Sequence, residues 1–326
     1  MADTTITQTV TLNDVKAAAD RIKPYALKTP LIRQLKLESR FGCELYLKAE
    51  NFQRVGAFKF RGAFNTLASL RETDDPSLVI TSSSGNHGQA VAASGQILGI
   101  RVIVVMPENA VQVKVDAVRG YGGDIEFAGT TSPEREARAQ EIGRETGGTV
   151  IGSFDDARII AGQGTTGLEI VEQLADVDLV LVPVGGGGLI SGIATAVKAL
   201  RPDARIIGVE PEGASDTYQS LREGRRITIE HIDTIADGLR TSSPGVLNFE
   251  IMKRLVDSIV LVSDDAIREA MRALAFDAKL TVEPSGAVAV AALLSGHVEV
   301  SAQKVVAVIS GGNVDPHAYA QVVRAG

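Results

Sequence analysis

The 326-residue chain has a single cysteine and no tryptophan, and aromatic residues make up only 4% of it. The lone Cys43 excludes an internal disulfide framework and a cysteine-based zinc site, and it fits a reducing compartment. So few aromatic residues argue against a β-sandwich. The 33 glycines are instead typical of an α/β protein with many tight turns between strands and helices.

The chain also lacks a long apolar run and an excess of basic residues. No segment approaches the length of about 20 apolar residues that a membrane-spanning helix needs. The first ten residues contain neither the basic nor the apolar part of a signal peptide. Because the formal net charge is −7, binding to nucleic acid or anionic lipid is disfavoured. We therefore expect a cytoplasmic protein without nucleic-acid or membrane partners.

Short apolar runs alternate with amphipathic helical segments along the chain. The expected strands are Glu44–Lys48, Leu78–Thr81, Arg101–Met106, Asp124–Ala128, Thr149–Ile151, Leu179–Val184, Arg205–Glu210, Ser258–Val262 and Lys304–Ile309. The expected helices include Gly88–Leu98, Val111–Tyr121, Pro133–Thr146, Gly164–Leu174, Leu189–Leu200, Ala266–Ala278 and Ser285–Leu294. This alternation predicts an α/β fold of parallel or mostly parallel sheets flanked by helices. Its ligand site is expected at the carboxyl ends of strands, in the loops that lead into helices.

Lys59 lies between two aromatic residues in the segment from Gly56 to Gly62, which we interpret as an apolar turn. Burial there would lower the pKa of its amine and leave a neutral amine able to form a Schiff base. Taken alone, the segment is explained better by a surface lysine at the start of a helix.

The segment 81–90, TSSSGNHGQA, follows an expected strand and opens a helix. The N-terminus of a helix offers free backbone N–H groups and the positive end of a dipole, which suit a carboxylate. An ordinary helix cap needs fewer polar side chains than this segment contains. We therefore favour a carboxylate-binding loop over a simple cap.

Four glycines, Gly185 to Gly188, separate an apolar strand from a helix and would let the backbone close around a phosphate group. A dinucleotide site is the alternative, because Glu210 ends the next strand. The Gly-x-Gly-x-x-Gly spacing fails, however, since its last position falls on Ile190 or Ser191. At the end of the last strand, Ser310 would either bond a ring nitrogen or belong to a glycine turn.

Together these segments resemble the fold-type-II pyridoxal 5′-phosphate (PLP) enzymes, and most closely their serine/threonine dehydratase and serine racemase family. The resemblance extends from Thr29 to Asn313 and lies in AFKFRGA, SSGNHGQA, AGQGT, PVGGGG and SGGN. It implies two domains of the tryptophan synthase β-like type. Residues 78–153 would form a small substrate-loop domain, and residues 1–77 plus 154–326 a large PLP-binding domain.

The resemblance also implies a role for individual residues. Lys59 would hold PLP and Phe58 would pack on its ring, while Ser310 would face the pyridine nitrogen and Asn86 the ring hydroxyl. The phosphate would be held by Gly185, Gly186, Gly187, Gly188 and Leu189. The residues expected to contact the substrate are Ser83, Ser84, Asn86, His87, Arg135 and Ser242. Ser84 would be an acid or base on the opposite face of the ring from Lys59.

The implied activity is that of an ammonia-lyase, which converts serine, threonine or 3-hydroxyaspartate to a 2-oxo acid and ammonia. An amino acid racemase using Lys59 and Ser84 is one alternative. A non-catalytic binding protein is another, against which the setting of Lys59 argues. A homodimer is expected, because two-fold symmetry is the commonest arrangement of soluble oligomers.

One further segment and two single residues concern metal binding and specificity. The segment 209–216 resembles a divalent-cation site with Glu210, Ala214 and Asp216 as ligands for Mg²⁺, Ca²⁺ or Mn²⁺, and a solvated acidic loop is the alternative. Gly152 stands where many relatives carry a histidine, so the pocket would accept a larger β-substituent. Arg135 resembles an arginine that reaches the substrate side chain, although a solvated surface charge explains it equally well.

Overall fold

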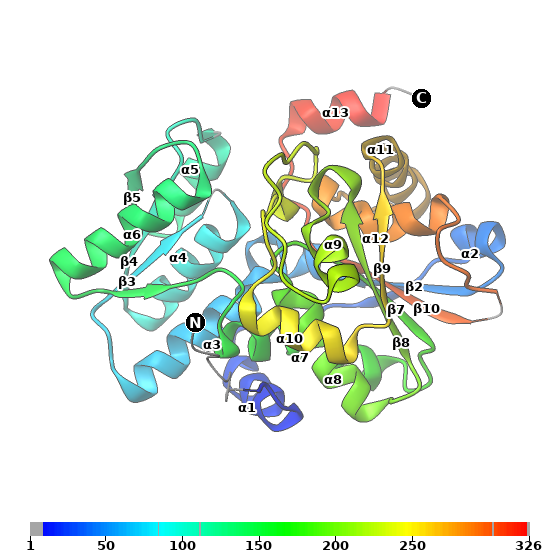
Figure 1. Cartoon of the computed structure of the whole chain (residues 1–326), viewed down its shortest axis with the longest axis horizontal. Coiled ribbons are helices and arrows are strands. Elements are labelled where there is room, and N and C mark those ends of the chain that lie inside the picture. Colours follow the sequence, from blue (N-terminus) through cyan, green and yellow to red (C-terminus); the bar gives the residue numbers. More distant parts are fainter. Residues whose placement is uncertain (1–8, 84, 111, 302, 325–326) are drawn as a thin grey trace.

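The computed structural model of the chain describes residues 9–83, 85–110, 112–301 and 303–324. Helices and strands alternate along most of this length (Figure 1). The strands are β1 (Leu31–Arg33), β2 (Glu44–Ala49), β3 (Leu78–Ser82), β4 (Arg101–Met106), β5 (Asp124–Phe127), β6 (Thr149–Ile151), β7 (Leu179–Pro183), β8 (Arg205–Pro211), β9 (Ser258–Val262) and β10 (Lys304–Ile309). The α-helices are α1 (Leu12–Ile22), α2 (Leu35–Phe41), α3 (Lys59–Thr73), α4 (Asn86–Leu98), α5 (Gln112–Gly120), α6 (Ser132–Thr146), α7 (Ala157–Gln173), α8 (Gly188–Leu200), α9 (Asp216–Glu223), α10 (Val246–Leu255), α11 (Asp264–Ala273), α12 (Pro284–Leu294) and α13 (Pro316–Arg324).

The strands form two sheets. The first has the order β1-β2-β10-β7-β8-β9 and is parallel except for β1, which pairs antiparallel with β2. The second has the order β5-β4-β3-β6 and is parallel throughout. The prediction of mostly parallel sheets flanked by helices is therefore confirmed. Every expected strand is present, and four of them have the expected bounds.

Helices cover both faces of the six-stranded sheet, and the four-stranded sheet lies with α4, α5 and α6 at the other side of the molecule (Figure 1). Along β7, Leu179 and Leu181 pack in one hydrophobic cluster with α12, while Val180 and Val182 pack in another with α8. Successive side chains of a strand point to opposite faces of a sheet. A strand buried on both faces therefore needs the continuous apolar run that the sequence shows.

Helix α3 lies against α4 on the side of the small sheet and against α7 on the side of the large one. Its Arg61 forms buried ion pairs with Glu50 (Nε–Oε2 2.7 Å) and Glu169 (Nη1–Oε1 2.7 Å). Lys48 adds a third pair, with 2.6 Å between its Nζ and Oε2 of Glu169. A buried charge without a partner is costly, so this paired cluster holds the start of α3 in place. Lys59 lies two residues before Arg61, in the first turn of the same helix.

No helix among the ranges given above is both long enough and apolar enough to cross a membrane.

Candidate active site

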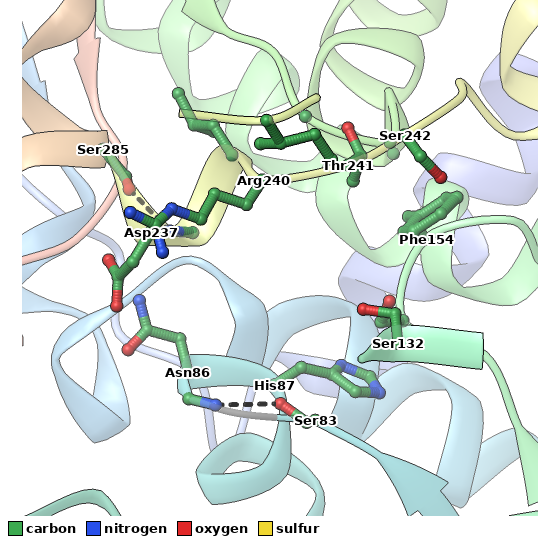
Figure 2. A pocket seen from close by; sticks show the side chains of 18 of the residues that line it. Ser83, Asn86, His87, Ser132, Phe154, Asp237, Arg240, Thr241, Ser242 and Ser285 are labelled. Atoms are coloured by element: carbon green, nitrogen blue, oxygen red, sulfur yellow. Dashed lines mark hydrogen bonds between the residues drawn. The ribbon is translucent and has the colours of Figure 1, made fainter. Parts of the chain in front are cut away.

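A pocket of about 730 Å³ is lined by residues from both sheets (Figure 2). Its wall contains the residues that follow β3, β7 and β10 at their carboxyl ends, where the strand–helix alternation predicts a ligand site. The expected site residues that meet in this wall are Phe58, Lys59, Ser83, Asn86, His87, Arg135, Gly185, Gly186, Gly187, Gly188, Leu189, Ser242 and Ser310. Ser84 lies outside the described residues.

Lys59 opens helix α3, so the prediction of an apolar turn is wrong at this residue. Its Nζ donates a hydrogen bond to the carbonyl oxygen of Ser153 at 2.9 Å and lies 5.2 Å from the centre of the Phe58 ring. Within the described chain it has no carboxylate partner. Burial lowers the pKa of Lys59 to about 8 from 10.5. The amine is therefore far easier to deprotonate than an ordinary lysine amine.

The loop after β3 turns directly into α4. Oγ of Ser83 accepts hydrogen bonds from the backbone N–H groups of Gly85 (3.2 Å) and Gly88 (3.0 Å), so this side chain shapes the loop. His87 is buried, and neither of its ring nitrogens has a partner among the residues that the structure describes. Burial and the nearby Lys59 hold the pKa of His87 well below 6.5. The site thus contains a neutral imidazole with unused hydrogen-bonding capacity.

The amide of Asn86 is held between two other side chains. Its Nδ2 donates to Oε1 of Glu283 at 2.7 Å, and its Oδ1 accepts from Nδ2 of Asn313 at 2.9 Å. Glu283 also lines the pocket, and sequence reasoning did not single it out. It precedes Pro284 at the start of α12, where an acidic residue is common as a favourable partner of the helix dipole.

The glycine loop between β7 and α8 has no space for side chains. Gly187 has φ +94°, which residues with a Cβ rarely adopt. A Cβ at Gly186 would lie 2.4 Å from the ring of Phe154, and one at Gly185 would lie 3.3 Å from Cα of Leu239. Helix α8 starts at Gly188, so the free N–H groups of its first turn lie at the pocket wall. This cradle fits a phosphate group.

Ser310 and Ser242 complete the part of the wall that belongs to the large sheet. Ser310 is buried, and its Oγ donates to the carbonyl oxygen of Ser285 at 3.4 Å. Ser242 is exposed and lies in the loop beyond η4 (Asp237–Leu239). Figure 2 shows Asp237, Arg240, Thr241 and Ser242 across the pocket from Ser83, Asn86 and His87.

Arg135 lines the pocket from α6, whose start is fixed by a capping box between Thr131 and Glu134. It is only 8% exposed, so the interpretation as a solvated surface charge is wrong. Its guanidinium bonds Oγ of Ser132 at 2.9 Å and the carbonyl oxygen of Thr130 at 3.3 Å, and its buried Nε has no partner in the described chain. Both of its partners are neutral, so the cation remains available for an anion.

Gly152 is exposed and does not belong to the pocket wall. A Cβ added there would have no atom within 4 Å. The position of the missing side chain is therefore open, and Gly152 does not shape the pocket wall.

The expected metal ligands are not part of this pocket wall and lie between the end of β8 and the start of α9. Glu210 and Asp216 are both buried, and Ala214 is buried between them in η3 (Glu212–Ala214). The carboxylate of Glu210 accepts backbone N–H groups of α9 at 3.1 and 2.8 Å. Burial and Asp216 raise its pKa well above 4.5, and burial raises that of Asp216 to about 7. Across the described ranges no three side chains of His, Cys, Asp or Glu are grouped to hold a metal.

The pocket residues fit PLP on chemical grounds. The loop without side chains and the N-terminus of α8 suit its phosphate, and the partly buried amine of Lys59, with its lowered pKa, suits its aldehyde. A second helix N-terminus, that of α4, remains for the carboxylate of an amino acid.

Comparison with known proteins agrees with this chemistry. Residues 22–311 match the family model described as pyridoxal-phosphate dependent enzyme. The chain is 41% identical to the L-threonine ammonia-lyase of Thermotoga maritima, over 97% of the chain and 79% of that protein. It is 42% identical to the L-threo-3-hydroxyaspartate ammonia-lyase of Saccharomyces cerevisiae, over 96% of both. The solved structure of maize serine racemase superposes with a TM-score of 0.93 at 39% identity, covering 97% of this chain and 98% of that one. The chain belongs to the pyridoxal-phosphate dependent enzyme family.

Proposed function

We propose that this protein is a PLP-dependent ammonia-lyase that removes water and ammonia from a small β-hydroxy amino acid. The observation on which this rests is the partly buried amine of Lys59, whose pKa is lowered to about 8, in a pocket between a phosphate cradle and a helix N-terminus. A purely binding protein has no need of such an amine, because burying a lysine costs free energy.

When bound, PLP supplies the electron sink that stabilises negative charge at the substrate Cα. Lys59 takes the proton from that carbon. With a pKa of about 8, roughly a tenth of its amine is neutral at pH 7, whereas an ordinary lysine would have well under a thousandth. The backbone N–H groups at the start of α4 bind the substrate carboxylate, and the neutral His87 beside them adds no charge. Ser310 offers a neutral hydroxyl to the pyridine nitrogen, which keeps the electron sink weak and favours loss of the β-hydroxyl group.

The preferred substrate in this proposal is 3-hydroxyaspartate, with threonine and serine as weaker ones. The support is Arg135, a buried cation in the pocket wall with only neutral partners. A guanidinium binds a carboxylate with two parallel hydrogen bonds, so it suits a side-chain carboxylate better than a hydroxyl or methyl group. One relative of the chain is itself named a 3-hydroxyaspartate ammonia-lyase.

A panel of L- and D-serine, threonine and 3-hydroxyaspartate, assayed for 2-oxo acid and for the inverted isomer, tests the activity. We expect 2-oxo acid from the L-isomers at rates well above those of isomer inversion. The absence of 2-oxo acid from every member of the panel would refute the lyase.

An amino acid racemase is the second candidate, since the maize relative is named a serine racemase. In that case Ser84, by its resemblance to the family serine, would serve the opposite face of the cofactor. Faster formation of the inverted isomer than of 2-oxo acid in the same panel would favour this candidate.

We also propose two domains and a homodimer. The strands β3 to β6 all fall within residues 78–153, which supports the small domain proposed for that range. A homodimer follows from the general prevalence of two-fold symmetric enzymes. Light scattering of the purified holoenzyme gives its mass, and a value near that of one chain would contradict the dimer.

A divalent cation is proposed at Glu210 and Asp216, with the carbonyl oxygen of Ala214. The support is that Glu210 and Asp216 are both fully buried and neither has a cationic partner in an ion pair of the described chain, while burial raises the pKa of both carboxyl groups. A cation between them would relieve this desolvation. Carboxylate and carbonyl oxygens are the ligands that Mg²⁺ and Ca²⁺ prefer.

This site predicts that Mg²⁺ raises the melting temperature of the protein. A ligand at about 100 times its Kd stabilises the folded state by about 2.7 kcal/mol. The cation competes with a proton on Asp216, whose pKa is about 7, so the gain should be larger at pH 8 than at pH 6. Asp216→Ala should abolish the gain, and Glu212→Gln, in the exposed part of the same loop, should keep it. An equal gain in the Asp216 variant would remove the cation from this loop.

A further inference from the structure

Glu283 is a buried carboxyl group in the pocket wall, 4% exposed, on the side of α12. Its Oε1 accepts the hydrogen bond from Nδ2 of Asn86, and Oδ1 of Asn86 accepts one from Nδ2 of Asn313. Asn313 in turn donates to the carbonyl oxygen of Val55 at 2.6 Å. A continuous chain of hydrogen bonds thus links the loop before Lys59, the loop after β10, the start of α4 and the start of α12.

We infer that Glu283 is a positioning residue that fixes the amide of Asn86 for contact with the bound cofactor. The inference rests on the proposed cofactor site, in which Asn86 meets the ring hydroxyl. A primary amide has two N–H donors and one carbonyl acceptor. Glu283 takes one N–H and Asn313 satisfies the carbonyl, so the second N–H is left for a ligand.

The opposite orientation of the Asn86 amide is disfavoured by both neighbours. A rotation by half a turn would place Oδ1 of Asn86 against the accepting oxygen of Glu283. It would also place Nδ2 of Asn86 against Nδ2 of Asn313, so that two donors would face each other. Two buried hydrogen bonds would be lost, and buried polar groups without partners are costly. The pair of neighbours therefore defines a single orientation before any ligand arrives.

Two glycines allow the surrounding loops to close on these side chains. A Cβ at Gly311 would lie 2.3 Å from Oε1 of Glu283. A Cβ at Gly56, where φ is +70°, would lie 2.5 Å from Oδ1 of Asn313. The two loops are also joined by a backbone hydrogen bond, in which the N–H of Gly312 donates to the carbonyl oxygen of Gly56 at 2.9 Å. The acceptor oxygen of Glu283 is thereby confined as well as buried.

Charged groups face Glu283 from two other elements. Burial and Asp237 on η4 raise the pKa of Glu283 to about 8. The hydrogen bond from Asn86, the Lys114 ammonium on α5 and the backbone N–H of Asn313 act in the opposite direction. Lys114 forms an ion pair with Asp237, so its effect on Glu283 is partly cancelled. The hydrogen bond from Nδ2 of Asn86 shows that Oε1 of Glu283 is the acceptor of this pair.

The affinity of the apoprotein for PLP, measured by absorbance titration, tests this inference. Glu283→Ala removes the acceptor and should raise the Kd of PLP by about 10-fold, the size expected for one buried hydrogen bond. Glu283→Gln keeps an acceptor oxygen and should restore the Kd to within about 3-fold of wild type. Glu299→Gln, at an exposed carboxylate outside the pocket wall, is the matched control and should change nothing. An unchanged Kd in Glu283→Ala would overturn the inference.

A double-mutant cycle separates positioning from general structural damage. If Glu283 acts through Asn86, then Glu283→Ala should change the Kd of PLP by less than about 2-fold in an Asn86→Ala background. The same 10-fold loss in both backgrounds would overturn the inference. Melting temperatures of the apoprotein variants show whether each has folded. Failure of the wild-type protein to bind PLP would instead refute the cofactor site itself, so the two failures are distinguishable.

Discussion

Replacing Lys59 with alanine is expected to lower kcat/KM for every accepted L-isomer by roughly 10⁴-fold or more, because one amine has two tasks. It holds the cofactor in the pocket, and it takes the proton from the substrate Cα. A general base alone contributes up to about 10⁴-fold, and loss of the covalent attachment adds to this. Measured initial rates of 2-oxo acid formation give the ratio.

The fold should survive this substitution. The ion pairs of Arg61 hold the start of α3 without help from Lys59, whose only polar contact in the described chain is the carbonyl oxygen of Ser153. The melting temperature of the apoprotein should not fall, because a buried amine with a lowered pKa destabilises the folded state. Lys253→Ala, at an exposed lysine of α10, serves as the control and should keep full activity.

Chemical labelling identifies the lysine independently of activity. Borohydride reduction of the holoenzyme followed by peptide mapping should place the pyridoxyl group on Lys59. A label on Lys48 or Lys114 would contradict the assignment, although the first is already engaged by Glu169 and the second by Asp237.

The short apolar runs of the sequence predicted the sheets well. A strand that is buried on both faces needs apolar side chains at nearly every position, and such a run is visible in the sequence. Strand β1 was not predicted, since its three residues end in an exposed arginine and form no apolar run like that of the equally short β6. At Lys59 the neighbouring glycines suggested a turn. In the structure Gly62 instead lets α3 approach α7, for a Cβ there would lie 2.9 Å from the carbonyl oxygen of Ile159. Tertiary packing, which a local pattern does not contain, decided this element.

The same limit applies to the site. The loops rich in Gly, Ser and Asn were found because each follows a strand and opens a helix, which fixes where they lie in the fold. Glu283 was missed because a carboxylate before a helix is common and its burial depends on the distant Gly311 and Asn86. Arg135 was left between two interpretations, and only the three-dimensional structure shows that it faces the pocket.

Arg135→Ala is the second substitution for which we expect a large effect, in this case on substrate specificity. It should lower kcat/KM for L-threo-3-hydroxyaspartate by about 100-fold, the size expected when one partner of a buried charged pair is removed. The value for threonine should change by less than about 3-fold, since threonine has no side-chain carboxylate for the guanidinium to bind. Arg135→Lys should be intermediate, because an ammonium keeps the charge and loses the two parallel hydrogen bonds.

Arg138→Ala on the same helix is the matched control for this specificity effect. Arg138 is paired with Glu126 and Glu141 on the surface, so its loss should leave the ratio of the two kcat/KM values unchanged. Equal losses for both substrates in Arg135→Ala would mean that Arg135 supports the loop through Thr130 and Ser132. A loss confined to the dicarboxylate would place the second carboxylate of the substrate at α6, where the buried Nε of Arg135 has no protein partner in the described chain.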